Sequence, residues 1–262
     1  LMLGGMSAMC VLTLWAAKPV EPMDTALEVP GMFPRISDAI ERAQQGDIIV
    51  VAPGTYTESL FLVGRKSCAN EEGILAPANL TIRTTNPRRP GDTMLKGLGN
   101  DAVLTFTNGV SRTVRIEGFV ITGGNNALGG GIRCEDSNPT IAYCHIGRNQ
   151  AGVGGGVYCK NSNPLLIESS IVMNQSVLDG AGIYIDAESH PVLEGCILYK
   201  NISSEWKDRG RECFIANGGS ARLVNTVIRS FQKTPMDSTL TFWDIEAGRP
   251  LLESSSAHSP RS

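Results

Sequence analysis

The chain has 262 residues, of which 42% are apolar, 19% charged and 29 in number are glycine. This is too apolar for a disordered chain, and it suffices for a core of ordinary size. The net charge is −3, with 23 Lys and Arg against 26 Asp and Glu, so the sequence lacks the basic footprint of a nucleic-acid partner. The glycines have no G-X-Y period, which excludes collagen and points to many tight turns.

Residues 1–17 contain no charged side chain, and Lys18 follows them. An apolar run of this length lies at the border between the core of a signal peptide and a short membrane span. We therefore expect residues 1–17 to be a signal peptide or a membrane anchor, and 18–32 to be a linker. The protein would then be extracellular, at the cell surface, or in the outer membrane or periplasm.

A helix is predicted over 34–45, where apolar residues recur at helical spacing and Gly46 follows as a stop signal. The first β-like run, Ile48 to Val51, comes directly after it. We expect the helix to cap the open end of the structure that the strands build.

Internal repeats dominate the middle of the chain. Three segments beginning at Ile132, Val157 and Ile183 align with one another, with starts 25 and 26 residues apart. Their shared columns hold Ile141, Leu166 and Leu193; Ile146, Ile171 and Leu198; and Asn149, Asn174 and Asn201.

A repeat of this length with two or three short strands cannot bury its apolar side chains alone, so copies must stack as coils of a solenoid. Weaker copies extend the pattern over 33–231, which gives about seven rungs. Equivalent positions then form ladders along the core. We expect Asn149, Asn174 and Asn201 to be a structural ladder at a corner, where each amide bonds to backbone and to its neighbour.

The segment from Phe33 to Glu58, FPRISDAIERAQQGDIIVVAPGTYTE, resembles the first segment of right-handed parallel β-helix proteins of the pectin-lyase-like superfamily. The repeats, with Asn149 followed by Gly154 to Gly156 and Val157, are similar to those of polymorphic outer-membrane proteins. The resemblance covers roughly 33–231 and implies an all-β, right-handed parallel β-helix solenoid with an N-terminal capping helix. It implies little about activity, since families on this scaffold include polysaccharide lyases, glycosidases and adhesins.

The catalytic residues remain unknown, because the N-x-D, D-D and G-H-G motifs of inverting pectinases are missing from the sequence. Lys160 with Arg133 and Asp186 would suit a polyuronate lyase, in which a basic residue is the base, sometimes with calcium; unless the protein is such a lyase, no cofactor is expected. Glu135 shares the column of Lys160. The alternative, which we favour, is a set of solvated charges on an outer strand. Arg148 and Lys200 share another column, with Met173 between them.

An insertion after the third repeat, SSEWKDRGRE, places Trp206 among charged residues that include Lys207 and Arg209. A tryptophan in a charged loop on a rigid scaffold is typical of a sugar-stacking or partner-contact site. The alternative is that Trp206 packs back on the rod.

The seven cysteines and three histidines form neither a C-x-x-C pair nor an H-x-x-x-H motif, so no metal site is predicted. Cys134 and Cys159 share an inward column, which favours two small buried side chains over a disulfide. Residues 232–262 leave the repeat, and we expect them to cover the last edge, with a strand near Thr239 to Trp243, and to end in a disordered tail.

The favoured interpretation is an exported β-helix module, acting as a monomer, that binds a polysaccharide or a cell-surface partner without catalysis. Two alternatives remain open. One is a polysaccharide lyase or glycoside hydrolase acting on a uronate-type glycan. The other is a structural or adhesin segment of a longer cell-surface protein.

Overall fold

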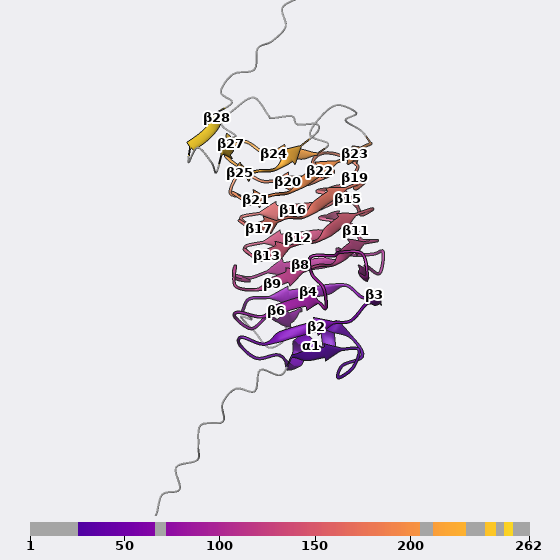
Figure 1. Cartoon of the computed structure of the whole chain (residues 1–262). Coiled ribbons are helices and arrows are strands. Elements are labelled where there is room, and N and C mark those ends of the chain that lie inside the picture. The colour runs from indigo at the N-terminus through magenta and orange to yellow at the C-terminus, as the bar shows by residue number, and fades with distance from the viewer. Residues whose placement is uncertain (1–25, 66–71, 205–211, 229–238, 245–248, 254–262) are drawn as a thin grey trace, which may run out of the picture.

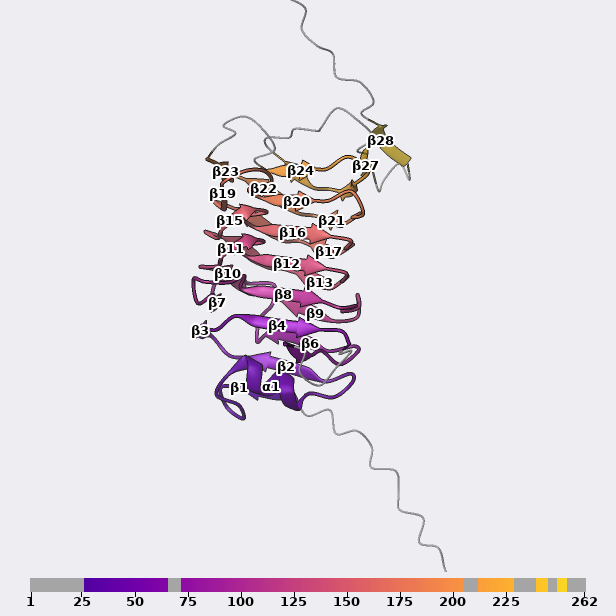
Figure 2. The same cartoon turned by 180° about the vertical axis from the view of Figure 1, so that it is seen from behind.

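The chain winds into a rod of stacked coils built almost entirely from short strands (Figure 1, Figure 2). The computed structural model describes residues 26–65, 72–204, 212–228, 239–244 and 249–253. One full coil passes through four sheets, here A to D, in the order A, B, D, C, as in β13, β14, β15 and β16.

Sheet A has ten strands, parallel except for the last pair. They are β1 (Leu27–Val29), β2 (Ile48–Val51), β6 (Thr81–Thr84), β9 (Arg115–Glu117), β13 (Thr140–Ala142), β17 (Leu165–Ile167), β21 (Val192–Glu194), β25 (Ser220–Val224), β27 (Thr239–Asp244) and β28 (Arg249–Glu253).

Sheet B has seven strands, and its count agrees with the expected number of rungs. Its strands are β3 (Gly54–Thr57), β7 (Thr93–Lys96), β10 (Val120–Thr122), β14 (His145–Gly147), β18 (Ser170–Val172), β22 (Ile197–Tyr199) and β26 (Val227–Ile228).

Sheet C has seven strands and sheet D four, so within the described residues only four coils pass through all four sheets. Sheet C consists of β4 (Leu60–Val63), β5 (Ile74–Leu75), β8 (Leu104–Thr107), β12 (Ile132–Glu135), β16 (Val157–Lys160), β20 (Ile183–Ile185) and β24 (Cys213–Ile215). Sheet D consists of β11 (Asn125–Leu128), β15 (Gln150–Val153), β19 (Gln175–Ser176) and β23 (Ile202–Ser203).

The core is a set of aliphatic ladders, because the strands pair in register from coil to coil. Ile141 pairs with Leu166, which in turn pairs with Leu193, and all three are buried. Alternate residues of a strand point to opposite faces. When one residue points into the core, the residues next to it in the strand therefore point outward. The columns expected from the repeats are those seen in the core.

Glycines let successive coils approach closely at the corner before sheet C. A Cβ added at Gly156 would lie 2.5 Å from the carbonyl oxygen of Gly182 in the next coil. Gly154, at the same corner, has φ of +67°, in the left-handed region that favours glycine. The glycine triplets of the repeats thus meet a steric requirement of stacking.

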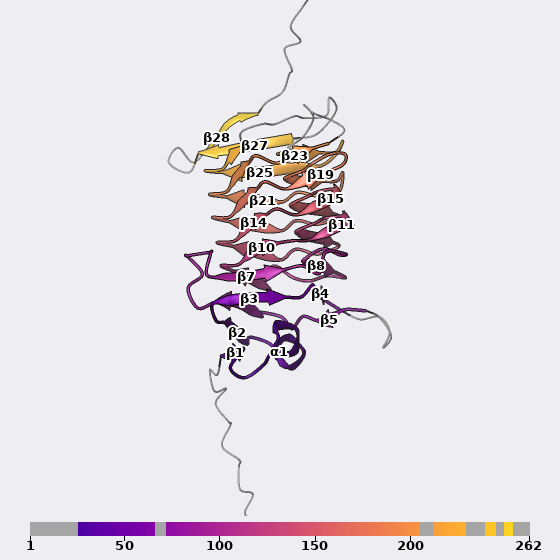
Figure 3. The ribbon, with the colours of Figure 1, turned by 90° about the vertical axis from the view of Figure 1, so that its right-hand side faces the viewer.

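A helix, α1 (Ile36–Arg42), lies at the N-terminal end of the rod (Figure 3) and is shorter than the expected 34–45. Ile36, Ala39 and Ile40 are buried against the first strands of the core. The Glu58 carboxylate accepts hydrogen bonds from the backbone N–H groups of Ile36 (2.9 Å) and Ser37 (3.1 Å). The carboxylate therefore holds the first turn of the helix.

The expected linker over 18–32 is wrong at its end, because β1 pairs in parallel with β2 and buries Val29. A three-residue strand before Pro30 is too short for its alternation to be recognised in the sequence. At the other end, β27 occupies the stretch where a last strand was expected, and it pairs with β25. Residues 1–17 lie outside the described part of the chain, and no helix within that part is long and apolar enough to cross a membrane.

Candidate functional site

The four catalytic candidates gather on the outer side of sheet C. Arg133 and Glu135 alternate with inward residues on β12, Glu135 pairs in register with Lys160, and Asp186 directly follows β20. Arg133 and Glu135 form a salt bridge of 2.9 Å with each other. These residues therefore lie on one face of the rod.

Asp186 is held in the corner that follows β20. Its carboxylate accepts hydrogen bonds from the Ser189 hydroxyl (2.6 Å) and from the backbone N–H groups of Glu188 (3.1 Å) and Asn161 (3.2 Å). A carboxylate engaged in this way orders a turn. Because Arg133 and Glu135 also bind each other, these contacts favour the structural interpretation of the face over a lyase centre.

An aromatic stack, which the sequence reasoning missed, lies on the same face. The ring centroids of Tyr158 and Tyr184 are 5.4 Å apart, and those of Tyr184 and Phe214 are 5.1 Å apart. Burial raises the pKa of Tyr158 to about 12. The signal was present, since all three residues are second in their sheet C strands. The rings cover one another's faces, so the stack stabilises the rod and offers little stacking surface to a sugar.

The asparagine ladder runs through the bend between sheets B and D. The side-chain amide of Asn149 donates to Asn174 Oδ1 at 3.0 Å, and that of Asn174 donates to Asn201 Oδ1 at 3.0 Å. All three side chains are buried. Asn201 in turn donates to the carboxylate of Glu212, which can only accept. Glu212 thereby ends the ladder as its last acceptor, and each asparagine amide also donates to a backbone carbonyl of the preceding coil, that of Ile121, Ile146 or Ile171.

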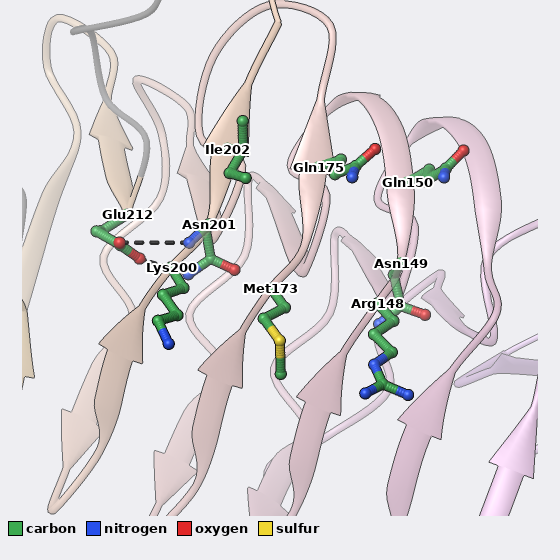
Figure 4. A pocket seen from close by; sticks show the side chains of 9 residues that line it. All are labelled: Arg148, Asn149, Gln150, Met173, Gln175, Lys200, Asn201, Ile202 and Glu212. Carbon is green, nitrogen blue, oxygen red and sulfur yellow. Dashed lines mark hydrogen bonds between the residues drawn. The ribbon is translucent and has the colours of Figure 1, made fainter.

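An open cavity of about 590 Å³ lies on the outside of this bend, and we call it the B–D groove (Figure 4). It is lined by Arg148, Asn149, Gln150, Met173, Gln175, Lys200, Asn201, Ile202 and Glu212. None of the four residues on sheet C belongs to it.

The bend itself places three side chains of different coils along the groove. Arg148, Met173 and Lys200 have φ of +58°, +54° and +59°, which is uncommon for residues other than glycine. This left-handed conformation turns the chain between sheets B and D and leaves all three side chains exposed. In Figure 4 they point away from Gln150, Gln175 and Ile202, which form the other side of the groove.

The lining combines positive charge, amide groups and apolar surface. Arg148 and Lys200 are two rungs apart, roughly 10 Å at ~4.8 Å per rung. Met173 lies between them and is 41% exposed. Gln150 pairs in register with Gln175, which pairs with Ile202. The groove therefore runs along the rod axis over three successive coils.

The predicted binding residues Trp206, Lys207 and Arg209 lie outside the described residues, in the segment just before Glu212. Within the described part, no group of three or more His, Cys, Asp and Glu is placed to hold a metal ion. Sequence reasoning found the Arg148 and Lys200 column but not the glutamines opposite, because only the bend brings the two sides together.

Among the comparisons with known proteins, the family model identifies the coil. A family model described as a right-handed beta helix region matches residues 97–234. A pectin methylesterase from Aspergillus niger, in deglycosylated form, is 12% identical over 83% of both chains, with a TM-score of 0.47. A second, penultimately deglycosylated form is 13% identical over the same shares, with a TM-score of 0.44. No curated protein matches the chain.

Proposed function

From the premise that this chain belongs to the right-handed β-helix family, we propose that it is an exported, monomeric module that binds a polysaccharide in the B–D groove without cleaving its glycosidic bonds. The observation that carries the proposal is the groove itself, with Arg148 and Lys200 on one side and Gln150 and Gln175 on the other. Export rests on the uncharged residues 1–17.

The chemistry of the lining suits a glycan. Glutamine amides donate and accept hydrogen bonds, which matches the hydroxyl groups of a sugar. Met173 and Ile202, 41% and 53% exposed, offer apolar surface to the carbon face of a ring. Arg148 and Lys200 favour acidic over neutral chains, because they would neutralise carboxylates along the polymer.

The same lining gives no basis for glycosidic cleavage. Glycosidases need two carboxylates across the scissile bond. Among the described lining residues the only carboxylate is that of Glu212, which is 3% exposed and hydrogen-bonded to Asn201. A group already used to end a buried ladder is poorly placed to protonate a leaving oxygen.

The proposal is tested by isothermal titration calorimetry with oligogalacturonate and with a neutral glucan of equal length. We expect the acidic chain to bind more tightly, and Arg148→Gln combined with Lys200→Gln to weaken it about tenfold, a change of about 1.4 kcal/mol. Arg89→Gln, on an exposed loop outside the groove, is the matched control and should bind as the unchanged protein does.

Two outcomes would contradict the proposal. Ultraviolet absorbance from unsaturated uronate ends would show lyase activity and overturn the claim that the glycan is left uncut. Equal binding by the double variant, or no binding of any glycan, would remove the groove from the function and favour the structural or adhesin alternative.

A further inference from the structure

Two histidines in the described chain each share a short hydrogen bond with a serine one rung away. His145 Nδ1 lies 2.8 Å from Ser170 Oγ, and His190 Nδ1 lies 2.7 Å from Ser220 Oγ. A serine hydroxyl becomes a useful nucleophile when a base in hydrogen-bond contact takes its proton. The two pairs make the same contact in different surroundings, so each serves as a comparison for the other.

The first pair adjoins the B–D groove. His145 and Ser170 are half-buried on the outer face of sheet B, in strands that lead directly into the groove residues Arg148 and Met173. A Cβ added at Gly147 would lie 3.1 Å from His145 Nε2. The absence of a side chain at Gly147 therefore leaves the imidazole its space beside the groove.

Neighbouring coils show that this space is particular to one rung. Gly147 pairs in register with Val172, and Val172 pairs with Tyr199, so the same column carries side chains in the next two coils. Ile197 pairs with Ser170 on the side away from His145 and is 49% exposed. The serine hydroxyl thus lies between a base and a small apolar surface.

The charge state of His145 suits a base. Burial, and to a lesser degree the positive charge of Arg148, lower the pKa of His145 below its ordinary 6.5. The imidazole is therefore neutral at neutral pH, and the tautomer with hydrogen on Nε2 presents a free Nδ1 to the hydroxyl. The guanidinium of Arg148 is a nearby cation that would favour negative charge developing on a carbonyl oxygen. Neither pair belongs to the groove lining itself, but His145 and Ser170 adjoin the groove through β14 and β18, whereas His190 lies in the corner before β21.

We propose that Ser170 and His145 are a nucleophile and base that hydrolyse small acyl esters, of the O-acetyl class, on the glycan held in the B–D groove. Delivery of the ester rests on the proposed function of the groove, whereas the chemistry at the serine does not. The glycan backbone stays intact, and only a substituent is removed.

Two steps complete the reaction, with water as co-reactant. In the first, Ser170 Oγ bonds to the carbonyl carbon as its proton moves to His145 Nδ1, and the bond from that carbon to the sugar oxygen breaks while the oxygen takes the proton. In the second, water adds to the acyl carbon and gives a proton to His145. The bond to Oγ then breaks, Oγ regains the proton, and acetic acid leaves and gives its own proton to solvent.

The first test measures release of p-nitrophenol from p-nitrophenyl acetate and of acetate from an acetylated polysaccharide. We expect Ser170→Ala and His145→Gln to lower both rates about 100-fold, the usual contribution of a positioned base. The matched controls Ser220→Ala and His190→Gln should leave both rates unchanged. Unchanged rates in Ser170→Ala, with its fold intact by circular dichroism, would overturn the proposal.

A covalent probe gives a second readout that a merely structural contact would not produce. Incubation with a fluorophosphonate followed by peptide mass spectrometry should find the adduct on Ser170, much reduced in His145→Gln and much less on Ser220. Equal labelling of both serines, or labelling of neither, would overturn the assignment of Ser170 and His145 as nucleophile and base. If Ser170 is labelled and cleaves the small ester while calorimetry finds no glycan bound, the pair stands and the groove proposal fails.

Discussion

Five buried cysteines lie in the described part of the chain, and all are free thiols: Cys134, Cys144, Cys159, Cys196 and Cys213. The expectation that Cys134 and Cys159 are small buried side chains agrees with their complete burial in neighbouring coils. Burial raises the pKa of Cys144 to about 12 and that of Cys196 to about 11. At neutral pH these thiols remain protonated and behave as part of the apolar core.

The raised pKa of Cys196 predicts a loss of stability in alkali. In the unfolded chain the thiol loses its proton near its ordinary pKa of 9.0, whereas in the folded protein it keeps the proton up to about 11. Its contribution is therefore fully present below pH 9 and is lost as pH rises toward 11, at roughly 1 kcal/mol per pH unit. Urea unfolding at several pH values above 9 should show Cys196→Ser losing less stability than the unchanged protein.

The chain itself indicates that serine fits this position. Ser169 occupies the same column one rung earlier, where its hydroxyl donates to the carbonyl of Ile167 at 2.8 Å and accepts from the N–H of Cys144 at 3.1 Å. Cys196→Ser should therefore fold normally at pH 7. The same alkaline loss in both proteins would assign the effect to other groups.

The first helix shows how one element depends on a side chain from another. Arg35, the residue before α1, provides no side-chain cap. The N–H groups in the first turn of α1 bond instead to Glu58, which is 9% exposed. Negative charge at a helix N-terminus is favourable, and hydrogen bonds to charged groups are the stronger kind. Glu58 therefore fixes α1 over the first strands.

Removing this carboxylate should loosen the N-terminal end of the rod. We expect Glu58→Ala to lower the free energy of unfolding in urea by about 1–3 kcal/mol, and Glu58→Gln, which keeps one acceptor, by less. Glu41→Ala, an exposed residue of the same helix, is the control and should change it by no more than about 0.5 kcal/mol. A control variant as unstable as Glu58→Ala would show that α1 depends on its composition and not on the contact.

At the scale of the whole molecule, each coil contacts its neighbours through register-matched columns, so a coil is a removable unit. Thr140 pairs with Leu165, and the ladder contacts between these coils join residues 25 apart, as from Ser137 to Ser162. Solenoid stability is close to a sum of coil and interface terms. Loss of one coil should therefore shorten the rod without changing its fold.

Deletion of residues 140–164 tests this directly. Pro139 would then precede Leu165, so every later residue keeps its column, and we expect a folded β-rich protein with a lower urea midpoint. Deletion of 140–152, about half of the same coil, is the matched control. It removes β13 and β14 but keeps β16, so the remaining strands cannot close a coil in register and that variant should fail to fold. Circular dichroism and urea unfolding distinguish the two, and equal behaviour would contradict the register argument.

The sequence by itself determined the coil. Its apolar residues recur every second position within strands and every 25 or so between them, and this double period fixes which side chains stack in the core and where Asn149, Asn174 and Asn201 align. Such information is local, because neighbouring coils are related by one repeat. The prediction was incomplete where a strand is too short to be recognised, as at β1, and in the bounds of α1.

The tertiary structure alone decided which outward side chains meet. The positive φ of Arg148, Met173 and Lys200 turns the chain between sheets B and D, and this turn forms the open groove. The identities of these three residues do not predict a turn of this kind. The contact of His145 with Ser170 likewise comes from the stacking of two coils, with Gly147 beside the imidazole. Outward residues carry no burial pattern to constrain them, so their function follows from the geometry of corners and not from the repeat that builds the rod.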